Sequence, residues 1–122
     1  MIELLAGFPN DILGFAYKGH VTKADYETVV IPAVVKALET RKKLRLYFAL
    51  QSDFSGIDAG AVWEDLKAGI SHLTRWERVA VVTDIHWVEQ TMRFVNILLP
   101  CPMKTFPTSE DAQARVWIAA AS

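Results

Sequence analysis

The sequence has a single cysteine and no long apolar run, and both absences limit what the protein can be. Because Cys101 is alone, an intrachain disulfide and a cysteine-rich metal site are excluded. No apolar stretch reaches the length of about 20 residues that a transmembrane helix needs. Residues 1–20 also lack the basic start and long apolar core of a signal peptide. We therefore expect a cytoplasmic protein, with peripheral association at the membrane as the alternative.

The motifs of common catalytic and cofactor-binding sites are missing as well. There is no Gly-x-Ser-x-Gly nucleophile elbow, and no glycine-rich phosphate loop with its Lys-Ser/Thr pair. His20, His72 and His86 have no metal-binding spacing, so we place them at the surface or at helix ends. These absences predict a protein without catalytic activity, cofactor or metal.

The chain also lacks an excess of charge of either sign. The 13 Lys and Arg residues and 14 Asp and Glu residues give a formal net charge of -1, and the isoelectric point is about 6.3. A nucleic-acid partner would need a concentrated basic surface. The one dense basic cluster, Arg41–Lys43 with Arg45 just beyond it, lies at a predicted helix end, where cations stabilise the helix dipole. The sequence therefore predicts no nucleic-acid partner.

Apolar and aromatic residues, in contrast, are abundant. The 122 residues are 52% hydrophobic and include four tryptophans. A chain of this length is typical of one domain, so we expect residues 1–122 to form a single domain. The hydrophobic fraction exceeds what one core needs, and a dimer interface, an apolar ligand pocket or a membrane-facing surface would account for the excess. We expect a homodimer.

Strand-like and helix-like segments alternate along the chain. Such alternation predicts an α/β fold with a central, mostly parallel five-stranded sheet and four helices. A turn at residues 7–11 joins the first two strands into an antiparallel hairpin at the sheet edge. The predicted strands span 2–6, 12–17, 44–50, 78–83 and 104–106, and the predicted helices span 23–41, 58–73, 85–99 and 108–120.

Three local patterns refine these helices. Thr22 followed by Asp25 predicts a capping box at the start of the first helix, with Val21 and Tyr26 placed for a hydrophobic staple. Pro32 falls inside that helix and predicts a kink. Asp84 is placed to cap the third helix.

Several segments are spread over nearly the whole chain, in a characteristic order: Gly19–Tyr26, Trp63–Lys67, Arg78–Asp84 with Trp87, Phe106, and Ala114–Ile118. Together they resemble the SpoIIAA-like family of STAS-like α/β domains. The resemblance implies a small non-enzymatic domain with a central sheet and four helices. STAS relatives include anti-sigma-factor antagonists that are switched by phosphorylation of a serine at the start of the second helix. The wider fold group includes domains that carry lipids and small ligands.

Large aromatic residues concentrate on the predicted second and third helices and their flanks. We expect some of these rings to fill the core, but too many lie beside the core stripes for all to be buried in a monomer. Our leading hypothesis is a non-enzymatic module that binds an apolar small molecule, or associates with the membrane surface, through these helices. A carboxylate there could orient a polar head group. The candidate residues are Phe54, Trp63, Asp65, Leu66, Trp87, Met92, Phe94 and Leu98.

The alternative hypothesis concerns the small polar loop after the strand over 44–50. It is a protein-interaction domain that acts on a partner protein and is switched by phosphorylation at Ser52 or Ser55, close to a helix N-terminus that favours an anion. Serine is also an ordinary residue for turns and caps. Asp53 follows Ser52 instead of preceding it, which departs from the antagonist pattern.

Overall fold

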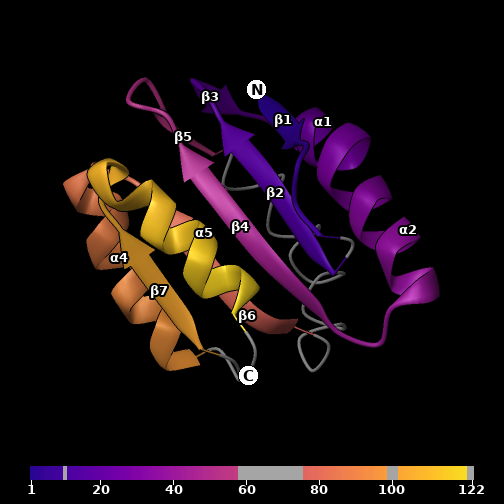
Figure 1. Ribbon diagram of the computed structural model, residues 1–122. Coiled ribbons are helices and arrows are strands. Elements are labelled where there is room, and N and C mark those ends of the chain that lie inside the picture. The colour runs from indigo at the N-terminus through magenta and orange to yellow at the C-terminus, as the bar shows by residue number, and fades with distance from the viewer. Residues whose placement is uncertain (10, 58–75, 99–101, 121–122) are drawn as a thin grey trace.

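Five strands form one mixed sheet in the computed structural model, which describes residues 1–9, 11–57, 76–98 and 102–120. The strand order is β1-β2-β4-β6-β7 (Figure 1). β1 and β2 pair antiparallel, and the other neighbours pair parallel. The predicted sheet with its antiparallel N-terminal edge is therefore confirmed. The strands are β1 (Ile2–Leu5), β2 (Ile12–Tyr17), β4 (Leu44–Leu50), β6 (Trp76–Val82) and β7 (Met103–Phe106).

The helices agree with the predicted positions wherever the structure describes them. The predicted helix over 58–73 lies outside the described residues. The last helix follows a short 3₁₀ turn over Thr108–Glu110, which the sequence pattern had included in the helix itself. The helical segments are α1 (Lys23–Asp25), a π-helical turn (Tyr26–Val30), α2 (Ile31–Thr40), α4 (His86–Leu98) and α5 (Asp111–Ala119).

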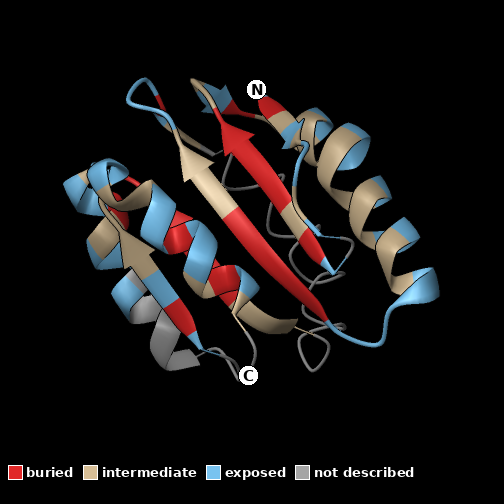
Figure 2. Cartoon of the chain, in the orientation of Figure 1, coloured by how far each residue is buried: buried red, intermediate tan, exposed pale blue. Residues whose placement is uncertain are grey.

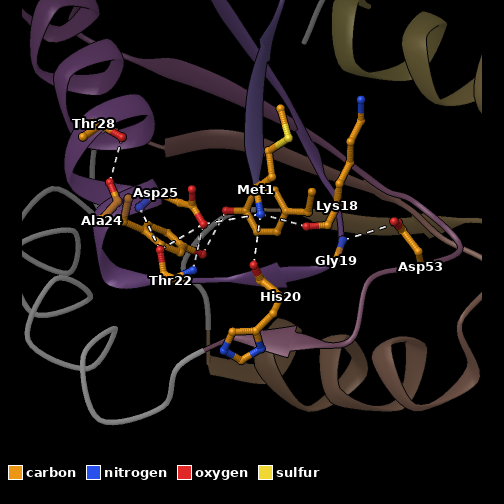
Figure 3. Close-up of polar contacts among 11 residues, drawn as sticks. Met1, Lys18, Gly19, His20, Thr22, Ala24, Asp25, Thr28 and Asp53 are labelled. Atoms are coloured by element: carbon orange, nitrogen blue, oxygen red, sulfur yellow. Dashed lines mark hydrogen bonds and ion pairs between the residues drawn. The ribbon is translucent and has the colours of Figure 1, made fainter.

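The first helix shows how local sequence determines its shape. The Thr22 side chain accepts a hydrogen bond from the Asp25 N–H, and the Asp25 carboxylate accepts one from the Thr22 N–H at 2.8 Å, so the capping box is confirmed (Figure 3). The irregularity expected at Pro32 is a π-helical turn that ends two residues earlier, at Val30. Proline has no N–H and its ring clashes with the carbonyl of the preceding turn, so a widened turn before it relieves both problems.

The two faces of the sheet are covered unequally. Strands β2, β4, β6 and β7 lie side by side in chain order, so right-handed crossovers place their helices on a single face. We call it the crossover face; it carries α2 and α4, which pack against a cluster that includes Phe15, Leu46 and Val81. The opposite face, the α5 face, buries Ala114 and Ile118 of α5 (Figures 1 and 2).

A second, two-stranded parallel sheet was not predicted. It pairs β3 (His20–Val21) with β5 (Gly56–Ile57), and its loops are linked through Gly19. The Gly19 N–H lies 3.4 Å from an Asp53 carboxylate oxygen (Figure 3), and the Gly19 carbonyl accepts from the Ser55 N–H at 2.9 Å. Gly19 has a φ of 55°, a conformation that favours glycine. These contacts fix the loop after β4 beside the end of β2.

Candidate functional site

A groove of about 450 Å³ opens on the α5 face, where the parallel strands β2, β4 and β6 end. We call it the α5 groove. Its volume falls within the range of about 300–1,000 Å³ that small-molecule sites occupy. The carboxyl ends of parallel strands are also the usual place for ligands in α/β proteins. The lining residues are Leu5, Ala16, Tyr47, Ala49, Leu50, Gln51, Ser52, Val82, Asp84, Thr108, Asp111 and Arg115.

Small side chains create this groove. Ala16 of β2 lies opposite Ala49 of β4, and Ala49 lies opposite Val82 of β6, so three short side chains stand in a row across the sheet. Farther back on the same face, Gly14 leaves room for the Phe8 ring, which a Cβ atom at that position would overlap. Two methyl groups and a valine cannot fill the space beneath the first turn of α5, and the sheet surface there remains an apolar floor.

A chain of three polar side chains forms one wall of the groove. The Tyr47 hydroxyl donates a hydrogen bond to one carboxylate oxygen of Asp111, and the Arg115 Nε donates to the other at 3.0 Å. The Arg115 guanidinium lies 5.1 Å from the ring centres of both Tyr47 and Phe8, within cation–π range. Burial of Tyr47 and, to a smaller extent, its hydrogen bond to Asp111 raise the pKa of the tyrosine to about 12. At neutral pH the hydroxyl is therefore a hydrogen-bond donor and cannot act as a base.

Asp84 stands at the mouth of the groove, and its role differs from the predicted one. Its carboxylate accepts the Thr108 N–H at 2.8 Å, which ties the end of β6 to the start of the last helical segment. This bond lowers the pKa of Asp84. At the start of α4, where we expected Asp84 to cap, the Thr83 hydroxyl accepts the Ile85 N–H at 3.1 Å. The prediction failed because a carboxylate in a βα loop can reach any helix start at that end of the sheet.

Of the aromatic candidates, the structure brings together Phe54 and Trp87. Their rings stack with centroids 5.9 Å apart and an interplanar angle of 21°. Phe54 belongs to the core of the crossover face, whereas Trp87 is 51% exposed on α4. Trp63, Asp65 and Leu66 lie outside the described residues. Met92, Phe94 and Leu98 belong to α4, and their side chains lie outside the description.

Ser52 and Ser55 are both exposed, in the loop between β4 and β5. Ser52 lines the α5 groove, and the Ser55 backbone bonds to Gly19. The short strand β5 separates both serines from the helix predicted to start at residue 58. Both hydroxyls are thus reachable from solvent, and Ser52 adjoins the groove.

The predicted positions of the histidines agree with the structure where it describes them. His20 is exposed in β3, and His86 is exposed at the start of α4; His72 lies outside the described residues. Among the residues that the structure describes, no three His, Cys, Asp or Glu side chains are grouped to hold a metal ion. Within the same part of the chain, no helix combines the length and apolarity needed to cross a membrane.

Sequence reasoning missed the α5 groove, although two patterns pointed to it. The spacing of Asp111 and Arg115 puts both side chains on one face of the last helix. Along the strand over 44–50, the even-numbered positions are leucine or phenylalanine and the odd-numbered ones are Arg45, Tyr47 and Ala49. That alternation distinguishes a fully apolar face from a mixed one, and the groove lies on the mixed face.

Comparison with known proteins identifies the class of fold. Residues 12–119 match the SpoIIAA-like family. The chain therefore belongs to the SpoIIAA-like family, and the resemblance drawn from its segments is confirmed.

A solved structure agrees with this assignment. The chain is similar to an uncharacterised protein of the DUF3478 family with a SpoIIAA-like fold from Shewanella loihica PV-4. The two are 25% identical, the match covers 97% of this chain and 94% of that one, and the TM-score is 0.79. No curated protein matches the chain. The family and the fold are thus established.

Proposed function

We propose that the protein is a non-enzymatic binding module that holds a small, mainly apolar molecule in the α5 groove. The observation that carries the proposal is a cavity of about 450 Å³ at the carboxyl ends of the parallel strands, with an apolar floor and a polar wall. This site replaces the surface of the predicted second and third helices as the main candidate. The wider STAS-like fold group includes carriers of lipids and small ligands, in agreement with this proposal.

The chemistry of the groove supports binding over catalysis. Leu5, Ala49 and Leu50 are partly exposed and offer apolar surface, whose removal from water stabilises a complex by about 25 cal/mol per Å². The Tyr47 hydroxyl and both Asp111 oxygens are already engaged with one another and with Arg115. Groups committed in this way position a ligand and hold the groove open, and they are poorly placed to exchange protons with it.

Filling the groove tests this proposal. We expect Ala49→Leu to weaken binding of the neutral apolar dye N-phenyl-1-naphthylamine at least about tenfold, because the larger side chain occupies the floor. The dye's fluorescence enhancement gives the affinity. Ala112→Leu is the matched control, since Ala112 is exposed on α5 and does not line the groove. Unchanged affinity in a folded Ala49→Leu variant, checked by urea unfolding, would contradict the proposal.

Membrane association is the second candidate, and the Trp87 indole favours it. A half-exposed tryptophan stacked on a buried Phe54 ring has the amphipathic character of residues at membrane interfaces. On this reading, wild-type protein should float with anionic phospholipid vesicles, and Trp87→Ala should lose most of that association. Val35→Ala is the control, because Val35 is equally exposed on α2. Vesicle flotation that is identical in all three proteins, or absent, would rule the candidate out.

Two further expectations stay proposals. A homodimer would cover some of the exposed apolar side chains, and sedimentation equilibrium tests it; a monomer at all concentrations would disprove it. Large exposed apolar residues are Met1, Leu4, Val35, Trp87 and Val116.

Phosphorylation at Ser52 would add a dianion at the groove mouth. Intact-mass measurement of native protein tests for this phosphorylation, and the lack of any phosphorylated form would count against it.

A further inference from the structure

The charges around the α5 groove are unbalanced. Among the described residues that line it, the charged side chains are Asp84, Asp111 and Arg115, two carboxylates against one guanidinium. Arg115 donates its Nε to Asp111 at 3.0 Å, and its guanidinium lies over the Tyr47 and Phe8 rings, so the charges of Arg115 and Asp111 offset one another. The remaining charge is the carboxylate of Asp84.

Asp84 is also the carboxylate with unused bonding capacity. Both Asp111 oxygens accept hydrogen bonds, from Tyr47 and from Arg115. Asp84 accepts the Thr108 N–H through Oδ1 and also a hydrogen bond from the Thr108 side chain, and the carboxylate is exposed, with room for a further donor. A carboxylate oxygen at the rim of an apolar groove can accept a further hydrogen bond from a charged donor.

We infer that the α5 groove binds an amphiphile with a primary ammonium head, its apolar part on the floor of Ala16, Ala49 and Val82 and its head on Asp84. The inference rests on the proposed function and adds the chemical class of the ligand. A carboxylate or phosphate head would meet Asp84 as a like charge, because the charges of Asp111 and Arg115 offset one another. A neutral alcohol could donate to Asp84 but would gain no ion pair.

Three probes of equal chain length test the head group. n-Octylamine, n-octanol and octanoate compete with N-phenyl-1-naphthylamine at neutral pH and low salt. We expect octylamine to displace the dye at about fivefold lower concentration than octanol, the size of an exposed ion pair, with octanoate the weakest. Added salt should narrow the gap between octylamine and octanol, because Asp84 is exposed.

Substitution of the carboxylate supplies the decisive comparison. Asp84→Asn should abolish the advantage of octylamine over octanol, with the affinity for octanol in the same variant as the reference. Asp11→Asn makes the same chemical change at the opposite end of β2 and should have no effect.

Two results would overturn the inference while the proposed function stands: octanoate competing as well as octylamine, or an octylamine advantage that persists in Asp84→Asn. If no probe competes and the dye does not bind, the proposed function itself fails.

Discussion

Replacement of Arg45 by methionine is expected to lower the free energy of unfolding by about 3–5 kcal/mol. Arg45 is only 7% exposed, a rare position for a charged residue. Its Nε and Nη2 donate to the Glu77 carboxylate, the former at 2.8 Å, and its Nη1 donates to the carbonyls of Ile118, at 2.8 Å, and Ala120. Methionine keeps the apolar stem of the side chain but leaves all three acceptors without this donor.

The acceptors explain why the loss should be large. The carbonyls belong to the C-terminal end of α5, where the helix leaves its last C=O groups unpaired and concentrates negative partial charge. Arg78 of the neighbouring strand also donates there, to the carbonyls of Trp117 and Ala120. The two arginines hold α5 onto the sheet, so the same substitution should loosen the helix that covers the α5 groove.

Urea unfolding followed by circular dichroism measures this effect. Arg93→Met is the control, since Arg93 is exposed on α4 and its loss should cost less than about 0.5 kcal/mol. The double variant Arg45→Met, Glu77→Met should recover part of the loss, because it no longer leaves a carboxylate without its cation. A loss for Arg45→Met no larger than for Arg93→Met would mean that the buried contacts contribute little.

Arg45 also shows where sequence reasoning reached its limit. The Thr22–Asp25 capping box was predictable because its members are three residues apart, and the alternation of elements was enough to predict the strand composition of the sheet. Arg45 was assigned to the basic cluster at the end of the preceding helix, yet it binds the end of α5, 73 residues away. Which helix end a strand residue meets depends on tertiary packing, and a single sequence does not encode that pairing locally.

The candidate site divides in the same way. Phe54 and Trp87, two of the aromatic candidates, stack on one another. The α5 groove, however, depends on the register that aligns Ala16 with Ala49 and Ala49 with Val82. Aromatic residues attract attention in a sequence, whereas a groove is made by residues that are too small to fill it. Separate inspection of the odd-numbered and even-numbered positions of each strand would have identified the mixed face of the sheet. It would not have identified the α5 residues that close the groove.

Above about pH 10, the folded protein is expected to lose stability through Tyr47. Its folded pKa of about 12 lies above the ordinary tyrosine value of about 10. The native state therefore keeps a proton that the unfolded chain releases, and between these two values the native state binds more protons. Stability thus falls as pH rises through this window. This stabilisation is fully present below about pH 10.

Tyr47→Phe isolates this contribution. At neutral pH the variant should be less stable by about 1–3 kcal/mol, because Asp111 loses a buried donor. At alkaline pH its stability should decline less steeply than that of the wild type. Some decline remains, since burial also raises the pKa of Tyr17, which bonds to Tyr26 on the crossover face. Urea unfolding from about pH 8 to 11.5 separates the two tyrosines when Tyr17→Phe is measured alongside.

If the free energy of unfolding fell with pH equally steeply in Tyr47→Phe and in the wild type, the Tyr47 hydroxyl would titrate normally and would not be held by Asp111. The consequence would extend to the groove. Asp111 is unavailable to a ligand because Tyr47 and Arg115 occupy both of its oxygens. If Tyr47 did not bond to this Asp111 oxygen, Asp111 would compete with Asp84 for an ammonium head. Asp84→Asn would then remove only part of the preference for octylamine over octanol. The stability of the protein at alkaline pH and the head-group selectivity of the groove are thus two independent tests of the Tyr47–Asp111 hydrogen bond.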